Sequence, residues 1–349
     1  MRYRLLSLAV AGVAAAVVLP AGVAPAAPGT AAAGPVAAAC TWRLDAKLAL
    51  PAGLTSATVS ATDGTADFAG TAWNFSVSDQ FFAVVWRAGR VSRLPTPVDS
   101  GSMAFGMNSH GDVVGVVLPP AGPSRPVLWS GGRLIELGVA APDISANPRD
   151  INDAGLIVGE AYLPANGNRA IAWSADQPSK FSYVASPGSE SYLSAVTETG
   201  TVVGYYSTAV QTVAATGTVA GGLQALPLPA GADNAYTVAA NSTYVAGAAH
   251  TAGAEGFHAV LWASGVPKDL SKDETAASGV NSAGTVVGNN FTTGRAVVWS
   301  GGTEQPLPTI TIGPAITSAA VGVITETNAI GGWLNTSAGD SRPVVWHCR

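Results

Sequence analysis

The chain has 349 residues, of which 48% are hydrophobic, only 11% are charged and 41 are glycine. This balance excludes an intrinsically disordered protein, because disordered chains combine low hydrophobicity with high net charge. The formal net charge is -5, and no run of lysines or arginines occurs. We therefore expect neither a nucleic acid nor an anionic membrane surface as a partner.

The N-terminal part of the chain carries export features. Residues 1–26 contain two arginines, a long apolar stretch and an Ala-Pro-Ala cleavage pattern, which together are typical of a secretory signal peptide. A retained membrane anchor is the alternative, but Pro20 interrupts the apolar stretch and no stop-transfer charge cluster follows. Residues 27–39 are rich in Ala, Gly and Pro and predict a flexible lead-in. We expect a secreted, extracellular protein without membrane insertion.

Cys40 and Cys348 are the two cysteines of the chain. Export would place them where a disulfide persists, and pairing would tie the ends of the mature chain together. A lipid anchor on Cys40 is an alternative, but Cys40 lies far from the apolar segment and lacks a large aliphatic residue three positions upstream. Two free thiols do not suit an oxidising compartment. We therefore predict a Cys40–Cys348 disulfide.

A short apolar strand that ends in glycine recurs along the chain. Its seven glycines are spaced 45, 44, 45, 43, 41 and 43 residues apart, and they are Gly70, Gly115, Gly159, Gly204, Gly247, Gly288 and Gly331. A turn signal precedes the strand, as in Asn152 and Gly155 of the third copy. Asn in a turn, followed three residues later by a Gly that can take positive φ, indicates a β-hairpin.

A third element in each copy is apolar and ends in tryptophan in six copies, at Trp86, Trp129, Trp173, Trp262, Trp299 and Trp346. The fourth copy has Thr212-Val213-Ala214-Ala215 in its place. A turn with glycine then leads to a fourth strand, whose leucine falls eight residues after the tryptophan; Phe181 holds this position in the third copy. Each copy thus predicts four short antiparallel strands. We expect the tryptophans in the core between copies.

A single four-stranded sheet cannot bury both faces, so the copies must stack on one another. Seven sheets arranged radially form a β-propeller, whose blades of roughly 40 to 45 residues match this period. A solenoid would repeat over fewer residues and lack antiparallel turns, and a barrel is less well supported. The sequence therefore predicts an all-β, seven-bladed propeller over residues 40–349.

The two ends of the chain support the count of seven blades. The last copy stops after its third strand, at Cys348. Trp42 and Leu50 keep the eight-residue spacing, and residues 47–50 have no preceding first or second strand. The N-terminal segment is therefore expected to supply the fourth strand of the last blade, which would bring Cys40 close to Cys348.

The G-x-N-x-x-G-x-V-V-G pattern, followed by an A/P-x-x-W element and a strand ending in leucine, is seen in residues 279–307. It resembles the HAF-repeat family of extracellular bacterial repeat proteins, over nearly all of residues 56–349. The family's frequent histidine ahead of the third strand is present here only as His258, and copies one, four and seven depart from the repeat pattern. The resemblance implies a secreted, propeller-like repeat array and brings no assigned chemistry.

No linear motif for chemistry is evident. The four histidines lack a second ligand at zinc spacing, and the turn already explains the calcium-like cluster of Asp150, Asn152 and Asp153. A nucleophile elbow is also missing. We expect no metal and no cofactor. Scattered acidic loop residues leave open a hydrolase or lyase at the central channel, because such sites seldom show as linear motifs.

A second aromatic set lies two or three residues past the motif glycine, accompanied by polar side chains. These positions face the loops beside the blade connections, where propellers often bind ligands. The candidate ligand-binding residues are Trp73, Asn74, Glu160, Tyr162, Tyr206, His250, Asn290, Phe291, Trp333 and Asn335. Packing of the strand ends is the alternative interpretation.

Three functions remain open from the sequence. The favoured one is a secreted, monomeric, non-enzymatic propeller that binds a carbohydrate or an extracellular protein on its loop face. The others are a propeller hydrolase or lyase acting at the channel, and a purely structural extracellular repeat protein. No catalytic residues can be named from the sequence.

Overall fold

The computed structural model describes residues 40–349 except Val77 and residues 310–313. The predicted signal peptide, residues 1–26, and the predicted lead-in, residues 27–39, lie outside the described residues. Within the described part of the chain, no helix is long and apolar enough to cross a membrane.

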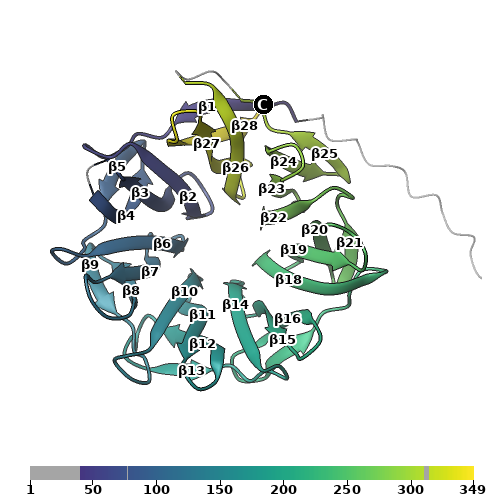
Figure 1. Ribbon diagram of the computed structural model, residues 1–349, viewed down its shortest axis with the longest axis horizontal. Helices are drawn as coiled ribbons and strands as arrows, with labels where there is room; N and C mark the ends of the chain where they lie inside the picture. Colours follow the sequence, from purple (N-terminus) through teal and green to yellow (C-terminus); the bar gives the residue numbers. More distant parts are fainter. Residues whose placement is uncertain (1–39, 77, 310–313) are drawn as a thin grey trace, which may run out of the picture. The chain divides into compact units, whose positions relative to one another are not determined.

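Residues 40–349 form one compact unit of seven four-stranded antiparallel sheets, set around a central axis like the blades of a propeller (Figure 1). The innermost strands are β2 (Ser56–Thr62), β6 (Gly101–Met107), β10 (Ser145–Ile151), β14 (Glu190–Val196), β18 (Ala232–Ala240), β22 (Thr275–Val280) and β26 (Ile316–Ile324). The second strands are β3 (Phe68–Asn74), β7 (Val113–Leu118), β11 (Leu156–Leu163), β15 (Val202–Ser207), β19 (Tyr244–Thr251), β23 (Val286–Asn290) and β27 (Ala329–Thr336).

The outer half of each blade completes the sheet. The third strands are β4 (Ser78–Arg87), β8 (Arg125–Ser130), β12 (Gly167–Ser174), β16 (Thr212–Thr218), β20 (Phe257–Ala263), β24 (Arg295–Ser300) and β28 (Ser341–Cys348). The outermost strands are β5 (Arg90–Arg93), β9 (Arg133–Glu136), β13 (Phe181–Tyr183), β17 (Gly222–Ala225), β21 (Val266–Asp269), β25 (Thr303–Pro306) and β1 (Trp42–Lys47). We number the blades 1 to 7 from β2 onward. The predicted fold class is confirmed.

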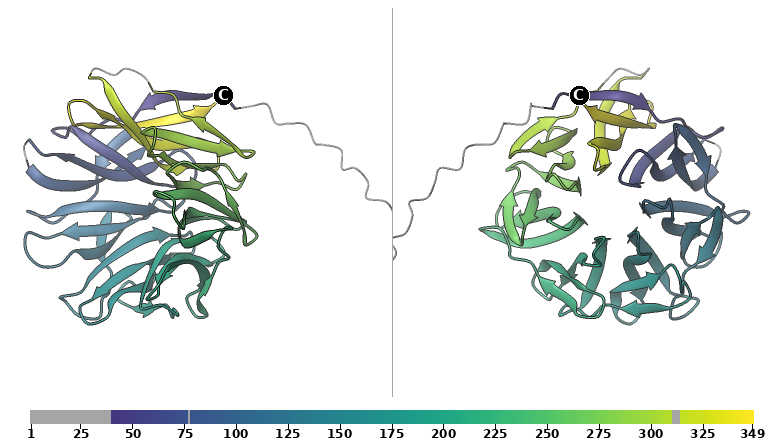
Figure 2. Two further views of the ribbon diagram at one scale, coloured as in Figure 1. Left: turned by 45° about the vertical axis from the view of Figure 1, so that its right-hand side comes forward. Right: turned by 180° about the vertical axis from the view of Figure 1, so that it is seen from behind.

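Blade 7 closes the ring with strands from both ends of the chain. β1 pairs with β28 antiparallel, and a Cys40–Cys348 disulfide with Cα atoms 5.4 Å apart joins the ends (Figures 1 and 2). The predicted position of this strand is wrong by several residues. Leu48, rather than Leu50, holds the closing position, because its N–H donates to Pro343 O, three residues before the blade's tryptophan.

The motif glycines mark a close approach of two backbones. A Cβ atom added at Gly159 would lie 2.0 Å from the carbonyl oxygen of Asn147 on β10. The same clash, at 1.9 to 2.2 Å, recurs in the other blades, at Gly70, Gly115, Gly204, Gly247, Gly288 and Gly332. In blade 7 the structural position is therefore Gly332, and the predicted Gly331 is one residue too early.

Two further positions differ from the sequence alignment. In blade 4, Val202 pairs with Gly217, where the equivalent residue of blade 3, Ile157, pairs with Trp173. Gly217, rather than Ala215, thus occupies the tryptophan position. In blade 3, Phe181 pairs with Trp173, because a longer turn precedes β13. Val184 takes the leucine position instead, and its N–H donates to Ala170 O.

The six tryptophans lie in the core between blades, as predicted, and each is at most 2% exposed. Five indole Nε1–H groups donate at 2.7 to 2.8 Å to carbonyl oxygens in the segment that leads into the blade, at Ala49, Pro95, Gly138, Pro227 and Pro308. Trp299 instead donates to Oε2 of Glu304 in its own blade, at 3.0 Å. The buried indole N–H groups thus anchor the chain between blades.

The turn between the first two strands of a blade also reaches the next blade. Gly155 has φ 75°, as the hairpin prediction requires. Asn152 Oδ1 accepts the N–H of Leu156, and Asn152 Nδ2 donates to Thr197 O of blade 4, each at 2.9 Å. Asn108 and Asn281 make the equivalent contacts. The repeat asparagine therefore holds its own turn and the neighbouring blade together.

Candidate functional site

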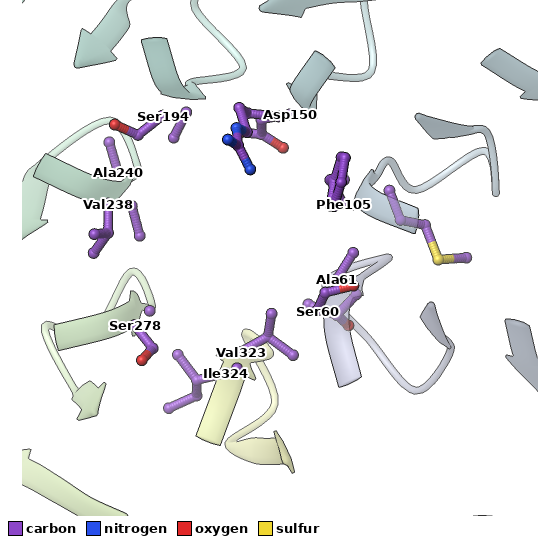
Figure 3. Close-up of a pocket in the computed structure, with 18 of the residues that line it drawn as sticks. Ser60, Ala61, Phe105, Asp150, Ser194, Val238, Ala240, Ser278, Val323 and Ile324 are labelled. Atoms are coloured by element: carbon purple, nitrogen blue, oxygen red, sulfur yellow. The ribbon is translucent and has the colours of Figure 1, made fainter. Parts of the chain in front are cut away.

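Each innermost strand contains a bulge opposite the motif glycine. One residue per blade has no partner in the strand ladder at this point, and all seven line the central channel: Ser60, Phe105, Arg149, Ser194, Val238, Ser278 and Gly322. We call these residues the bulge ring. Figure 3 shows five of them around the channel axis. A bulge redirects a side chain that regular pairing would place elsewhere.

The bulge ring surrounds a cavity of about 180 Å³. Ser60 Oγ donates to Ala104 O of blade 2 at 2.7 Å, and Ser194 Oγ donates to Thr237 O of blade 5 at 2.6 Å. These hydroxyl groups therefore bind neighbouring blades. Arg149 is the one charged member of the ring.

Arg149 forms a bidentate ion pair with Glu160 on the adjacent strand. Arg149 Nε lies 3.0 Å from Oε2 and 3.1 Å from Oε1, and Nη2 lies 2.6 Å from Oε1. Asn147 Nδ2 also donates to Oε1, at 3.0 Å. The guanidinium carbon lies 5.2 Å from the ring centroid of Phe105. Burial alone would lower the pKa of Arg149, but the hydrogen bonds and charge of Glu160 outweigh it and raise that pKa.

Three tyrosines stand next to this ion pair. The rings of Tyr192 and Tyr205 are stacked, with centroids 4.6 Å apart and planes at 18°, and Tyr236 meets Tyr205 edge-on at 6.0 Å. Together with Arg149 and Glu160 they line a cavity of about 370 Å³, which we call the tyrosine pocket. Burial raises the pKa of Tyr205 to about 12, so its phenol is neutral at ordinary pH and can donate a hydrogen bond.

The tyrosine pocket lies on one side of the bulge ring. Tyr192 and Tyr236 precede the bulge residues of β14 and β18 by two positions, while Glu160 and Tyr205 follow the motif glycines of β11 and β15 by one. All four therefore lie toward the end of the propeller that carries the connections between blades, such as residues 94–100. We call this end the connection face and the opposite end the turn face.

The turn face has a different character. A third cavity, of about 380 Å³, is lined there by five carboxylates, among other residues: Asp63, Asp150, Asp153, Glu198 and Glu326. Most of them bind turn backbone. For example, Asp153 accepts the N–H of Ser109 at 2.8 Å, and Glu198 accepts the N–H of Asp153 at 3.0 Å. Within the described residues, no group of three or more His, Cys, Asp or Glu side chains could hold a metal ion.

Asp150 follows Arg149 directly and lines both the bulge-ring cavity and the turn-face cavity. Its oxygens accept the N–H groups of Ile151 and Val196, each at 2.9 Å. Burial raises the pKa of Asp150 to about 6, although these two hydrogen bonds lower it in part.

Of the ten ligand-binding residues predicted from the sequence, only Glu160 lines the tyrosine pocket. Tyr206 is 7% exposed and packs in the core between blades 3 and 4. Asn74 and Asn290 are buried, and their Nδ2 groups donate to Gly53 O and to the carboxylates of blade 6, respectively. These three side chains therefore have structural partners.

The other six predicted residues are spread over five blades. Tyr162 and Phe291 are exposed, Trp73 contacts Phe75 and Phe81, His250 pairs with Asp233, Asn335 Nδ2 donates to Ser318 Oγ, and Trp333 is partly buried on β27. Trp333 follows Gly332 directly, so it lies one position past the structural glycine rather than two. None of these six side chains lines the bulge-ring cavity, the tyrosine pocket or the turn-face cavity.

Sequence reasoning missed Arg149, Tyr192, Tyr205 and Tyr236. Tyr205 lies one residue past its motif glycine, the same position as Glu160 in blade 3, so the repeat spacing that contains Glu160 also points to Tyr205. The other three lie on innermost strands, where neither the unpaired bulge residue Arg149 nor a tyrosine two positions before a bulge has a sequence signature of its own.

No protein-family model and no curated protein matches the chain. Solved propellers do match. A virginiamycin B lyase from Staphylococcus aureus, solved with quinupristin, has a TM-score of 0.54 at 13% identity and covers 88% of this chain and 99% of its own. The propeller domain of the Trilobed protease from Pyrococcus furiosus gives 0.54 at 12% identity, over 84% of this chain and 94% of its own.

A puromycin-hydrolyzing peptidase from Mycobacterium tuberculosis gives a TM-score of 0.57 at 10% identity, over 84% of this chain and 50% of its own. Identities this low show the fold alone. The protein is therefore a seven-bladed β-propeller, and its function has to be argued from its own site.

Proposed function

We propose that this protein is an extracellular propeller that binds a carbohydrate in the tyrosine pocket without transforming it. The observation that carries the proposal is one cavity that combines three tyrosine rings with an Arg–Glu pair. Aromatic faces make dispersion contacts with the C–H face of a sugar ring, while convergent polar groups fix its hydroxyls. An extracellular location is supported by the Cys40–Cys348 disulfide. We also propose, from the repeat pattern of residues 56–349, that the chain belongs to the HAF-repeat family.

Glu160, which lines the tyrosine pocket, and Asp150, which lines the bulge-ring cavity, already have partners, and this favours binding over hydrolysis. Glu160 accepts hydrogen bonds from Arg149 and Asn147, and Asp150 accepts two backbone N–H groups. A glycosidase needs two carboxyl groups that are free to act on either side of the scissile bond. A hydrolase or lyase is the second candidate, and the raised pKa of Asp150 is the observation that favours it.

A glycan array tests the proposal. We expect the labelled protein to bind a defined group of glycans, and Tyr205→Ala to weaken that binding by about tenfold or more, because it removes the ring between the other two. Tyr183→Ala is the matched control, since Tyr183 is 39% exposed on the outermost strand β13 and should leave binding unchanged.

Three results would overturn the proposal: no glycan bound by the wild type, equal loss in the two variants, or cleavage of the bound glycans. Urea unfolding of both variants shows that any loss does not come from misfolding.

A further inference from the structure

The free edge of Arg149 is the main polar donor of the tyrosine pocket. Its Nε–H and one Nη2–H point to Glu160. The remaining three N–H groups of the guanidinium have no partner among the described residues, and 43% of the side chain is exposed. A ligand in the pocket can therefore accept hydrogen bonds from this edge.

Glu160 supplies an acceptor beside that donor. Oε1 receives Asn147 and Arg149, whereas Oε2 receives only Arg149 Nε, so Oε2 keeps acceptor capacity. Because the ion pair is planar and bidentate, donor and acceptor are held side by side. Adjacent hydroxyl groups of a sugar ring match this arrangement, since one can accept from Arg149 while the other donates to Glu160.

The local charge favours a neutral ligand. Glu160 offsets the charge of Arg149, and Asp150 and Glu190 lie close by: Asp150 follows Arg149 in the chain, and Glu190 Oε2 accepts from the hydroxyl of Tyr192 at 3.3 Å. An anionic ligand would face these carboxylates, and a cationic ligand would face Arg149. A neutral polyol is repelled neither by the carboxylates nor by Arg149.

The floor of the pocket favours the end of a glycan over an internal residue. Phe105, Arg149, Ser194 and Val238 line both the tyrosine pocket, of about 370 Å³, and the smaller bulge-ring cavity, of about 180 Å³. They stand between the pocket and the turn face, so a ligand that enters from the connection face meets the smaller cavity beyond them. A chain end fits such a cavity, whereas an internal sugar residue would have to continue on both sides.

We propose that the tyrosine pocket binds the terminal ring of a neutral glycan. Arg149 donates a hydrogen bond to one hydroxyl group of this ring, and Glu160 accepts one from the adjacent hydroxyl group. This inference rests on the proposed function and adds the ligand class and the two specificity-determining residues.

Calorimetric titration with methyl glycosides tests the ligand class. The panel contains methyl glucoside, methyl mannoside and methyl galactoside, the matching methyl glucuronide as the acidic probe and methyl glucosaminide as the cationic probe. We expect at least one neutral glycoside to bind about tenfold more tightly than both charged probes. Added NaCl should leave its affinity unchanged, because no net charge is neutralised. Preference for a charged probe, or strong salt dependence, would overturn the inference.

A substitution separates charge from shape. Glu160→Gln keeps the size of the side chain but leaves the charge of Arg149 unbalanced, so we expect the ratio of neutral to acidic affinity to fall by about fivefold or more. Asn147→Ala removes the other partner of Glu160 without changing the charge and should leave the ratio as in the wild type. An unchanged ratio in Glu160→Gln contradicts the assigned role. If this variant does not fold, the affinities of the wild type for the panel and their salt dependence still test whether the pocket prefers a neutral ligand.

The two proposals fail in different ways. If no glycan or glycoside binds, the proposed function fails together with this inference. If sugars bind and Tyr205→Ala abolishes binding, but charged probes are preferred, the carbohydrate site stands and only the neutral, diol-reading assignment is wrong.

Discussion

Asn152 joins two blades with one side chain. It is 1% exposed, and its amide completes the turn of blade 3 while it donates to Thr197 O of blade 4. Asn241 in blade 5 holds its own turn by accepting the N–H groups of Thr243 and Tyr244, but its Nδ2 is buried without a partner among the described residues. Asn152 thus stabilises both its own turn and the contact with the next blade, whereas Asn241 stabilises its own turn alone.

Substitution of these two residues tests that separation. Asn152→Ala removes the contact with blade 4 and leaves the backbone N–H of Leu156 without its acceptor, while Thr197 O keeps the N–H of Gly200. We expect it to lower the free energy of unfolding by about 2 kcal/mol. Asn241→Ala loses only turn contacts and should cost about 1 kcal/mol or less. Urea unfolding with an unchanged m-value measures both, and equal losses would show that the contact between blades adds nothing.

Asp150 makes stability depend on pH. Its pKa is about 6 in the folded protein and about 3.9 in an unfolded chain, so the folded state holds the proton more tightly. This contribution is fully present below pH 4 and is lost as the pH rises through 6. Relative to Asp150→Asn, the free energy of unfolding of the wild type should therefore fall by about 2 to 3 kcal/mol between pH 4 and 7. Parallel stability curves for the two proteins would contradict this assignment.

At the scale of the strand, the motif glycine of the second strand and the bulge of the innermost strand act together. The glycine lets the inner strand approach, and the bulge opposite turns one side chain into the channel. In blade 4, a Cβ atom on Gly204 would lie 1.9 Å from the carbonyl oxygen of Tyr192. Gly200 in the same blade has φ 80° and nothing within 4 Å of an added Cβ.

These two glycines predict different costs. Gly204→Ala must push two paired strands apart, so we expect a loss of at least about 3 kcal/mol in the free energy of unfolding. Gly200→Ala meets only the strain of positive φ, about 1 kcal/mol. Chemical unfolding of the two variants compares them, and a small effect at Gly204 would refute the close approach.

Strand order and blade number could be predicted because their signals are local. Turn glycines, alternating apolar residues and the tryptophan each need only neighbouring residues. The misplacements at Leu50, Phe181, Ala215 and Gly331 share one cause: counting residues assumes constant turn lengths, and backbone pairing does not keep them constant. The disulfide was predictable because ring closure brings the two ends of the chain together.

The site was largely beyond the sequence. Tyr192 faces Tyr205 directly across the β14–β15 ladder, whereas Tyr236 lies on β18 of the next blade, and only the packing of blade 5 against blade 4 brings it to Tyr205. Of the pocket, Glu160 alone was predicted. In blade 4 the prediction fell on Tyr206, one position past the equivalent residue Tyr205, and the side chain of Tyr206 lies on the other side of its strand, in the core.

At the scale of the whole molecule, the disulfide secures the closing blade. Cys40 and Cys348 are 308 residues apart, and a cross-link over such a loop stabilises by at most about 5 to 6 kcal/mol in the chain-entropy model. We expect the Cys40→Ser, Cys348→Ser double variant to lose roughly 2 to 5 kcal/mol in urea unfolding. Glycan affinity below the unfolding transition should not change, because the tyrosine pocket is lined by residues of blades 2 to 5, and its three tyrosines lie in blades 4 and 5, away from blade 7 (Figure 1). Unchanged stability would show that strand pairing alone closes the ring.

The channel is asymmetric, with aromatic rings and a neutral ion pair toward the connection face and carboxylates at the turn face. The central claim is that a carbohydrate binds at the first of these ends. A crystal structure of the protein with the tightest-binding glycan of the array tests it most directly. We predict density for a terminal sugar ring against Tyr205 and Tyr236, with two of its hydroxyls on Arg149 and Glu160. Density for the sugar at the turn face or on the outer strands, with the tyrosine pocket free of it, would contradict the account.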